Sequence, residues 1–270
     1  MAFIQVDNLV KKYGDSAASV TAVRGISLAI ENGELISIMG ESGSGKSTLL
    51  SMMGALSSPT SGKYLVDEID VYGLGQEERA DFRRNSLGFV FQSFHLIPYL
   101  TVRENVMLPL ATGREKGTKK RALADEALTR VGLAGKGDRL PAQISGGEQE
   151  RVAIARATVN HPPILLADEP TGNLDSKTTR EIMELLKRLN EDGMTILMVT
   201  HNPECAHFAG RILRLSDGLL VEDEDRRKEG GNGRSFWEKK GGVSKVGSPG
   251  HFPVVHEPLS WRKPTDSMEE

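Results

Sequence analysis

The 270-residue sequence has few residues of several kinds, and each shortage narrows what the chain can be. It contains one cysteine, Cys205, which excludes an internal disulfide and fits a reducing cytosol. Its uninterrupted apolar runs fall well short of the ~18 residues that a membrane-spanning helix needs. The first residues, Met1–Asp7, lack a basic region and a long apolar core, so we expect no signal peptide. If membranes matter to its function, another polypeptide must cross them.

The sequence also lacks a strong charge imbalance. With 34 Lys and Arg against 37 Asp and Glu, the formal net charge is -3, which gives no sign that nucleic acid is a main partner. The length suits one sizeable α/β domain, or one domain with a tail, and is sufficient to bury a hydrophobic core.

The most informative stretch that is present runs from Gly40 to Thr48 and has the pattern G-x-x-x-x-G-K-S/T. It follows a short apolar run of strand length and precedes residues that can continue a helix, which is the context that phosphate binding requires. Glycines let backbone N–H groups approach phosphate oxygens, and the helix N-terminus adds its dipole. The predicted nucleotide-binding residues are Gly40, Glu41, Ser42, Gly43, Ser44, Gly45, Lys46, Ser47 and Thr48. Lys46 would reach the β- and γ-phosphates, and the Ser47 hydroxyl would be a Mg²⁺ ligand.

A second motif is the apolar run Ile164–Ala167 followed by two acids, Asp168 and Glu169. Such a strand places both acids at the carboxyl edge of a parallel sheet, where these folds bind ligands. Asp168 is suited to hold Mg²⁺, and Glu169 to act as general base for the attacking water. Adjacent carboxylates on a strand point opposite ways, so we expect a turn at Pro170 to bring both to the phosphate.

A third motif is Ser145–Gln149, of sequence SGGEQ, at the start of a predicted helix. Two glycines there leave unpaired N–H groups, which can bind an anion. Taken alone, this signal is weak, and a simple helix cap explains it equally well. One nucleotide rarely needs two such loops roughly 100 residues apart, which suggests that this loop serves a nucleotide held by a second copy.

The remaining pattern alternates strands with helices and indicates a parallel sheet wrapped by helices. We predict a turn at Lys11–Gly14, a hairpin-like turn at Asn32–Gly33 and one strand over Tyr64–Val71. A helix over Lys119–Val131 is expected to have Thr118 as its N-cap and to stop at Gly132. Beyond Glu222 periodicity ends, which predicts a flexible C-terminal tail over 223–270. That tail holds both tryptophans, Trp237 and Trp261, and is therefore also a candidate docking segment.

Together these motifs resemble those of the ATP-binding subunits of ABC transporters, over roughly residues 1–222. Within that family, Gly40–Ser47, Phe89–Gln92, Ala167–Asp175 and Met198–His201 resemble the macrolide-exporter and lipoprotein-releasing branch. The resemblance implies an α/β P-loop NTPase core with a mixed sheet and a helical subdomain near residues 93–155.

The resemblance also implies roles for individual residues. Tyr13 matches an aromatic that stacks on adenine, Gln92 a residue that reaches the metal and the attacking water, and His201 a histidine that contacts the γ-phosphate. Ser145, Gly146, Gly147 and Glu148 match the signature loop that contacts the opposite subunit's nucleotide, and Asp175 matches a loop that crosses the dimer interface. The signature reads Ile-Ser-Gly-Gly-Glu rather than Leu-Ser-Gly-Gly-Gln, and Glu148 adds a negative charge that the helix dipole tolerates.

The implied protein is therefore an ATPase that binds ATP and Mg²⁺ in a head-to-tail homodimer. It would drive an integral membrane permease from the cytoplasmic face of the plasma (inner) membrane, as a peripheral subunit, without nucleic acid. The alternative is a soluble ABC ATPase acting on nucleic acid or the ribosome, but those commonly carry a long coiled-coil insertion or two nucleotide-binding halves. A P-loop kinase or GTPase would leave the Ser145–Gly147 motif and His201 unexplained. The transported substrate stays open, because the permease supplies the pathway.

Overall fold

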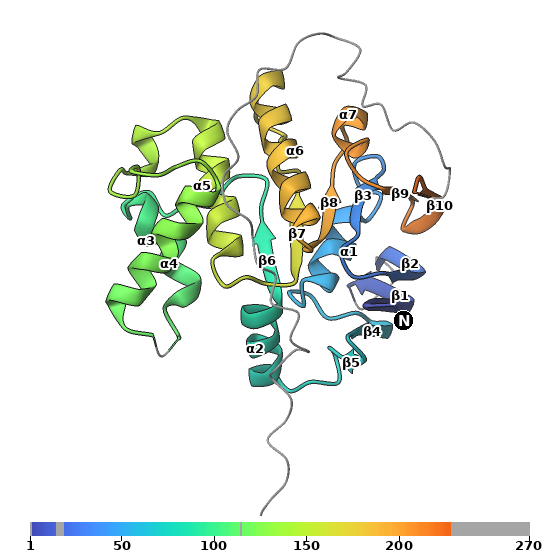
Figure 1. The fold of residues 1–270 in the computed structure, drawn as a ribbon. Helices are drawn as coiled ribbons and strands as arrows, with labels where there is room; N and C mark the ends of the chain where they lie inside the picture. The colour runs from blue at the N-terminus through green and yellow to red at the C-terminus, as the bar shows by residue number, and fades with distance from the viewer. Residues whose placement is uncertain (1, 15–18, 114, 228–270) are drawn as a thin grey trace, which may run out of the picture.

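The computed structural model describes residues 2–14, 19–113 and 115–227, whose strands and helices are labelled in Figure 1. The strands are β1 (Ile4–Tyr13), β2 (Val20–Ile30), β3 (Leu35–Met39), β4 (Ser61–Val66), β5 (Ile69–Asp70), β6 (Leu87–Val90), β7 (Ile164–Asp168), β8 (Thr195–Val199), β9 (Arg211–Ser216) and β10 (Leu219–Asp225). The helices are α1 (Lys46–Met53), α2 (Gln76–Ser86), α3 (Val102–Met107), α4 (Gly117–Arg130), α5 (Gly146–Thr158), α6 (Ser176–Glu191) and α7 (Pro203–Ala206), with short 3₁₀ turns η1 (Leu108–Leu110) and η2 (Pro141–Gln143).

The larger sheet has six strands in the order β10-β9-β3-β8-β7-β6. Strands β9, β3, β8, β7 and β6 pair in parallel, and β10 pairs antiparallel with β9. Every residue of β3 and β8 is buried, because helices cover both faces of a parallel sheet and favour continuous apolar strands. The predicted mixed sheet is confirmed.

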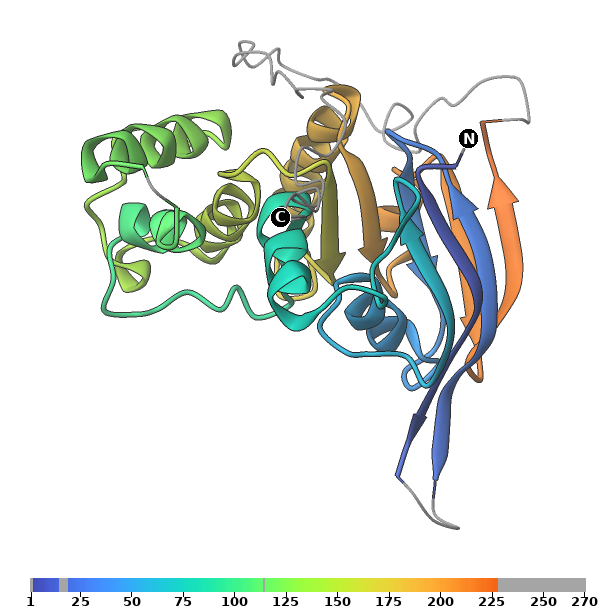
Figure 2. The same cartoon turned by 90° about the horizontal axis from the view of Figure 1, so that it is seen from below.

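A second, antiparallel sheet has the order β2-β1-β4-β5. One hydrophobic cluster joins residues of this sheet, of α1 and of the larger sheet, and Leu49, Leu50, Met52 and Met53 of α1 are fully buried in it. Figure 2 shows α1 between the strands of the two sheets. This packing holds the start of α1, and with it the phosphate loop, between two rigid layers.

Helices α3, α4 and α5 pack together at one side of the larger sheet (Figure 1). A second hydrophobic cluster runs from Val102 and Leu128 through Val152 and Ile154 to Leu165 and Met198. Helix α5 therefore joins helices α3 and α4 to the larger sheet by continuous apolar packing.

Several sequence expectations differ from the structure. Residues 11–13 continue β1 and pair with Val20–Val23 of β2, so the predicted turn at Lys11–Gly14 is wrong apart from Gly14 itself. The cross-strand partners supplied by β2 outweigh the weak local turn signal. Tyr64–Val71 is two strands joined by a turn, because Asp67 and Glu68 both have positive φ.

Two further turn and cap predictions need correction. A turn exists at Asn32–Gly33, but β2 and β3 belong to different sheets, so it does not close a hairpin. Helix α4 begins one residue before Thr118, and Lys116 occupies the N-cap position without a side-chain cap hydrogen bond, so Thr118 is not the N-cap. Gly132 does follow the end of α4, with φ of 79°, as a left-handed stop residue.

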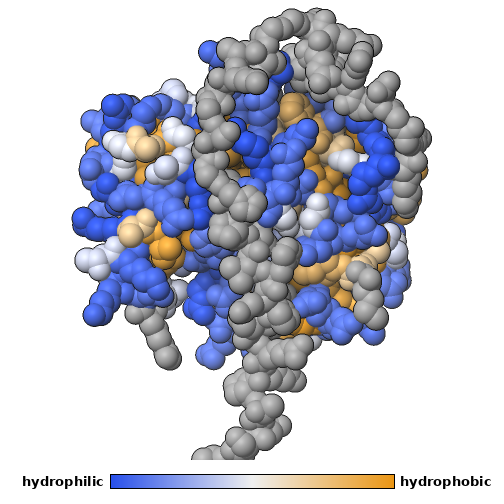
Figure 3. Space-filling view, in the orientation of Figure 1, coloured by the Kyte–Doolittle hydropathy of each residue, from blue (hydrophilic) through white to orange (hydrophobic). Residues whose placement is uncertain are grey.

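Strand β10 continues to Asp225 and so includes the first three residues of the predicted tail, because its antiparallel partner β9 is long enough to pair with them. Arg227 then forms an ion pair with the buried Glu34 at 2.5 Å. Trp237 and Trp261 lie outside the described residues. No helix in the described ranges is long and apolar enough to cross a membrane. On the face seen in Figure 3, hydrophobic residues show only as patches between hydrophilic ones.

Candidate functional site

The phosphate loop connects the buried end of β3 to the start of α1. Gly45, the residue before α1, has φ of 98°, and a Cβ on it would lie 2.3 Å from the carbonyl oxygen of Ala22, so only glycine fits. Lys46 is 7% exposed, and its ammonium donates hydrogen bonds to the carbonyl oxygens of Gly40 (2.8 Å) and Glu41 (2.7 Å). Within the described residues no side chain caps α1, which leaves its first N–H groups available to an anion.

Ser47 and Asp168 meet at the carboxyl edge of the larger sheet. The Ser47 hydroxyl donates a hydrogen bond to Asp168 Oδ1 at 3.3 Å. Burial raises the pKa of Asp168 above its ordinary value, and the hydrogen bond from Ser47 opposes that rise. Ser47 lies at the start of α1 and Asp168 at the end of β7, so two side-chain oxygens lie close together. Oxygen atoms are the ligands that a hard cation prefers.

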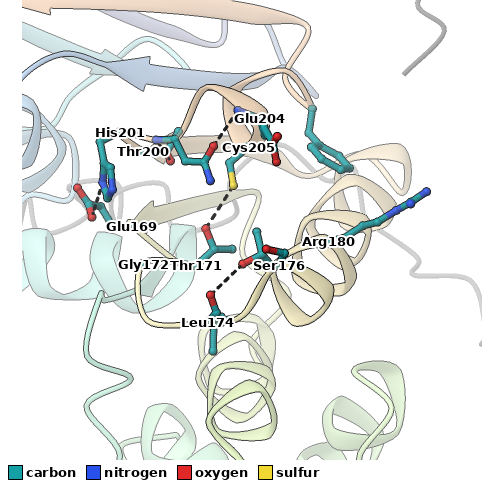
Figure 4. Close-up of a pocket in the computed structure, with 13 residues that line it drawn as sticks. Glu169, Thr171, Gly172, Leu174, Ser176, Arg180, Thr200, His201, Glu204 and Cys205 are labelled. Atoms are coloured by element: carbon teal, nitrogen blue, oxygen red, sulfur yellow. Dashed lines mark hydrogen bonds and ion pairs between the residues drawn. The ribbon is translucent and has the colours of Figure 1, made fainter. Parts of the chain in front are cut away.

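Gln92, Glu169 and His201 form a second group, the Glu169 cluster. They follow the ends of β6, β7 and β8, which are neighbouring parallel strands and therefore end at the same edge of the sheet. Glu169 Oε2 accepts a hydrogen bond from Gln92 Nε2 (3.3 Å) and lies 3.0 Å from His201 Nδ1. Figure 4 shows His201 and Glu169 facing each other beside a pocket that Thr171 and Cys205 also line. The structure thus brings the predicted general base together with two other predicted site residues, Gln92 and His201.

The turn predicted at Pro170 is present, since residues 170–173 form a turn and the N–H of Gly172 donates to the carbonyl of Glu169 at 3.1 Å. Glu169 itself has a left-handed φ of 48°, and its N–H donates to the carbonyl of Val199 at 3.0 Å. The change of chain direction therefore begins at Glu169 and continues through the predicted turn at Pro170. A left-handed non-glycine residue is strained and often marks a functional position. This conformation directs the Glu169 carboxylate toward the ends of β6 and β8.

The signature loop, Ser145–Glu148, begins α5. The Ser145 hydroxyl accepts from the Glu148 N–H (3.3 Å), and Glu148 Oε2 accepts from the Ser145 N–H (2.9 Å), so the two residues form a capping box. The capping box uses the N–H groups of Ser145 and Glu148 and not those of Gly146 and Gly147. The geometry is therefore compatible both with a simple helix cap and with an anion site.

Asp175 caps the neighbouring helix α6. Its Oδ1 accepts from the N–H groups of Lys177 and Thr178, and its Oδ2 from the Thr178 hydroxyl at 2.5 Å. A Cβ on Gly147 would lie 2.3 Å from Thr178 Cγ2, so the starts of α5 and α6 touch. The signature loop and the Asp175 loop therefore form one surface. Tyr13 belongs to neither group: it ends β1, is 47% exposed and has the Lys11 ammonium 5.0 Å from its ring centre.

Two side chains at this site are absent from the sequence predictions. Lys136, in the loop after α4, forms an ion pair with Glu148. Arg156, near the end of α5, donates to the carbonyl oxygens of Phe94 and His95, just beyond Gln92. Neither basic residue lies in a recognisable sequence motif. Only the tertiary contacts of Lys136 and Arg156 show that they belong to the site.

The fold and the grouped residues define a P-loop nucleotide-binding protein, and the comparisons agree. A family model described as "ABC transporter" matches residues 23–172. The lipoprotein-releasing system ATP-binding protein LolD of Geobacter metallireducens is 48% identical over 223 residues, which are 82% of this chain and 99% of that protein. The macrolide export ATP-binding/permease protein MacB of Rhodopirellula baltica is 46% identical over 227 residues, which are 83% of this chain.

Among solved structures, the dimeric post-hydrolysis state of the ATP-binding cassette MJ0796 of Methanocaldococcus jannaschii, bound to ADP and Pi, is similar with a TM-score of 0.77. The two chains are 46% identical in sequence, and the matched region covers 83% of this chain and 99% of the MJ0796 chain. The chain spans about a third of the length of its MacB relatives and nearly all of LolD.

The chain belongs to the ABC transporter family, among its ATP-binding proteins. This confirms the resemblance, the fold class and the ATPase class expected from the sequence. The nucleotide-binding chemistry of the class is confirmed with it. The metal, the permease and the role of each residue go beyond these similarities and are argued below.

Proposed function

We propose that the chain hydrolyses ATP in a head-to-tail homodimer and thereby drives a membrane permease. The observation that carries this proposal is the Glu169 cluster, which collects a carboxylate, an amide and an imidazole at the sheet edge that also holds Ser47 and Asp168. The names of the similar proteins support it: one is part of a lipoprotein-releasing system, another is an export ATP-binding/permease protein, and a third is dimeric.

In this proposal the phosphate loop, Gly40–Thr48, binds the triphosphate of ATP. The N–H groups at the start of α1 donate to phosphate oxygens, and the helix dipole favours their negative charge. The Lys46 ammonium, which donates to the carbonyl oxygens of Gly40 and Glu41 in the same loop, is proposed to reach the β- and γ-phosphates. Tyr13, exposed at the end of β1, offers its ring face to the adenine base.

The donors fit Mg²⁺. A hydroxyl, a carboxylate and an amide oxygen, from Ser47, Asp168 and Gln92, are the hard oxygen ligands this ion prefers, and Ser47 and Asp168 already lie in hydrogen-bond contact. When bound, the ion neutralises charge on the phosphate oxygens. Asp168 also has to remain ionised despite its partial burial, and the Ser47 hydrogen bond favours that state.

Glu169 is proposed to accept the proton of the attacking water. Gln92 Nε2 and His201 Nδ1 both contact the same oxygen, Oε2, so they hold the carboxylate in one orientation and leave Oε1 for the water. His201 is largely exposed, with 67% of its side chain accessible, and is proposed to contact the γ-phosphate. The three residues would thus orient water, base and phosphate together.

The signature loop and Asp175 are proposed to close over the nucleotide of the other copy. Ser145, Gly146 and Gly147 lie at the start of α5, with the Asp175 loop beside them. Glu148 stabilises the loop through the capping box. The permease partner would place the chain at the cytoplasmic face of the plasma (inner) membrane, as a peripheral subunit without a nucleic-acid partner.

The assignment of Glu169 is tested by Glu169→Gln. The amide keeps the size and the contacts with Gln92 and His201 but accepts no proton, so ATP binding should persist while kcat falls by about 100-fold or more. Steady-state ATPase rates and nucleotide binding, measured on the full chain, check this. Glu191→Gln, at the far end of α6, is the matched control and should keep the wild-type rate. Near-wild-type turnover in Glu169→Gln would reject the assignment.

A further inference from the structure

Glu148 places a negative charge in the loop that the proposed function assigns to the partner's γ-phosphate. Its carboxylate is one quarter exposed, and its pKa is lowered below the ordinary value, first by the ion pair with Lys136 and then by the Ser145 N–H. Glu148 is therefore ionised at neutral pH. A carboxylate beside a phosphate site repels the phosphate unless a cation offsets it.

Lys136 supplies that cation. Its ammonium pairs with Glu148 Oε1, while Glu148 Oε2 accepts from the Ser145 N–H at 2.9 Å. The two carboxylate oxygens therefore have different partners, one in the signature loop and one in the loop after α4. Each partner fixes one oxygen, so the carboxylate is held on the Ser145 backbone.

The position of Lys136 is set by backbone contacts with α3. The N–H groups of Val102 and Arg103 donate to the carbonyl oxygens of Arg139 and Gly137, each at 2.8 Å. The Arg103 guanidinium also pairs with Asp138. The loop that carries Lys136 is thus held to α3 by residues 137–139. Only about a third of the Lys136 side chain is accessible to solvent.

We propose that Lys136 is a positioning residue of the ATPase, which cancels the charge of Glu148 and keeps the signature loop attractive to the partner's γ-phosphate. This inference rests on the proposed function, since it needs a second copy's nucleotide at Ser145–Gly147. Its distinctive consequence is a charge balance. Removing the lysine alone leaves a repulsive carboxylate, whereas removing both charges restores neutrality.

The test compares wild type, Lys136→Met, Glu148→Gln and the double variant. Lys136→Met should raise KM for ATP and weaken ATP-dependent dimerisation by about 5- to 30-fold, with a smaller change in kcat, from one uncompensated charge near the phosphate. The double variant should return to within about threefold of Glu148→Gln. Dimerisation is measured by sedimentation in a Glu169→Gln background, and Lys136→Arg should keep the wild-type KM.

Lys119 and Glu115 form the matched control pair, because they are a lysine–glutamate ion pair on the same side of the molecule, at the start of α4. Lys119→Met and Glu115→Gln should leave KM and dimerisation unchanged. Loss of function in the double variant equal to that in Lys136→Met, or a wild-type KM in Lys136→Met, would overturn the charge-balance role. If the wild-type chain neither hydrolyses ATP nor dimerises with it, the proposed function fails first, and this inference falls with it.

Discussion

At the scale of single residues, the most unusual group is the carboxyl of Glu150 in α5. The residue is fully buried, and neither carboxylate oxygen has a hydrogen-bond partner among the described residues. Burial raises its pKa to about 8, and the nearby Arg156 only partly offsets this. Glu150 is therefore mainly protonated at neutral pH, and it destabilises the fold wherever it must ionise.

Glu150→Gln should remove a pH dependence of stability. Between pH 4.5 and about 8 the folded chain keeps a proton that the unfolded chain loses, so the free energy of unfolding falls as pH rises through this window. The amide does not ionise, so the variant should be more stable than wild type at pH 8.5 by up to about 5 kcal/mol and similar at pH 5.

Urea unfolding of the full chain at both pH values measures this difference. Glu77→Gln, at an exposed position in the first turn of α2, is the control and should follow the wild-type pH dependence. Equal stabilisation by Glu150→Gln at pH 5 and 8.5 would show that the effect is one of packing rather than of proton binding.

The residues of the site differ in how far the sequence could predict them. The Gly40–Thr48 loop is predictable because all its requirements are local: glycines, lysine and hydroxyl in consecutive positions. The edge position of Asp168 and Glu169 follows from a short apolar strand. The left-handed conformation of Glu169 does not, since it accompanies a tertiary hydrogen bond from its N–H to Val199.

At the scale of elements, α5 connects the two groups of the site. Ser145 begins this helix, and Arg156 near its end donates to the carbonyls of Phe94 (2.6 Å) and His95 (2.5 Å). Both of those residues have left-handed φ, 57° and 46°, without being glycine, so the segment after Gln92 is strained. The guanidinium fork holds that strained segment against the helix that carries the signature loop.

Arg156→Gln should loosen the segment after Gln92. Loss of two charge-assisted hydrogen bonds should destabilise the fold by about 1–3 kcal/mol and raise amide exchange at residues 93–96 more than in β7. Hydrogen exchange with mass spectrometry measures this. Arg84→Gln, in an exposed ion pair of α2, is the control. Unchanged exchange at 93–96 in Arg156→Gln would mean that the backbone, and not Arg156, fixes this segment.

Element boundaries follow the same distinction between local and distant causes. The stop of α4 at Gly132 needs only a local left-handed residue. By contrast, Lys11–Tyr13 joins β1 because β2 supplies a partner, and Asn32–Gly33 separates two sheets that only the tertiary fold defines. Lys136 illustrates the limit: nothing in its neighbours along the chain indicates that it pairs with Glu148, twelve residues away.

At the scale of the whole molecule, the site is proposed to be shared between two copies. Within one chain, the phosphate loop with Asp168 and the Glu169 cluster lies at the edge of the larger sheet, whereas the signature loop and Asp175 form the separate surface at the starts of α5 and α6. A head-to-tail dimer would pair each phosphate loop with the signature loop of the other copy.

If each nucleotide site is shared between two copies, the same two substitutions should give different results when they are on different copies and when they are on the same copy. Lys46→Met disables a phosphate loop, and Ser145→Arg places a bulky cation in a signature loop. Each site of the proposed dimer combines the phosphate loop of one copy with the signature loop of the other. If the two substitutions are on different copies, both therefore lie in the same site, and the second site is intact. If both are on one copy beside a wild-type copy, each composite site carries one defect.

The two heterodimers are prepared by giving the two copies different purification tags. All chains also carry Glu169→Gln, and the number of ATP molecules retained per dimer is measured. The divided variant should retain about one ATP per dimer, half the number of the parent, whereas the variant with both substitutions on one copy should retain at least about tenfold less than the parent. The reverse order would place each nucleotide within a single copy. Because both heterodimers contain the same substitutions, differences in folding or expression cannot produce this contrast.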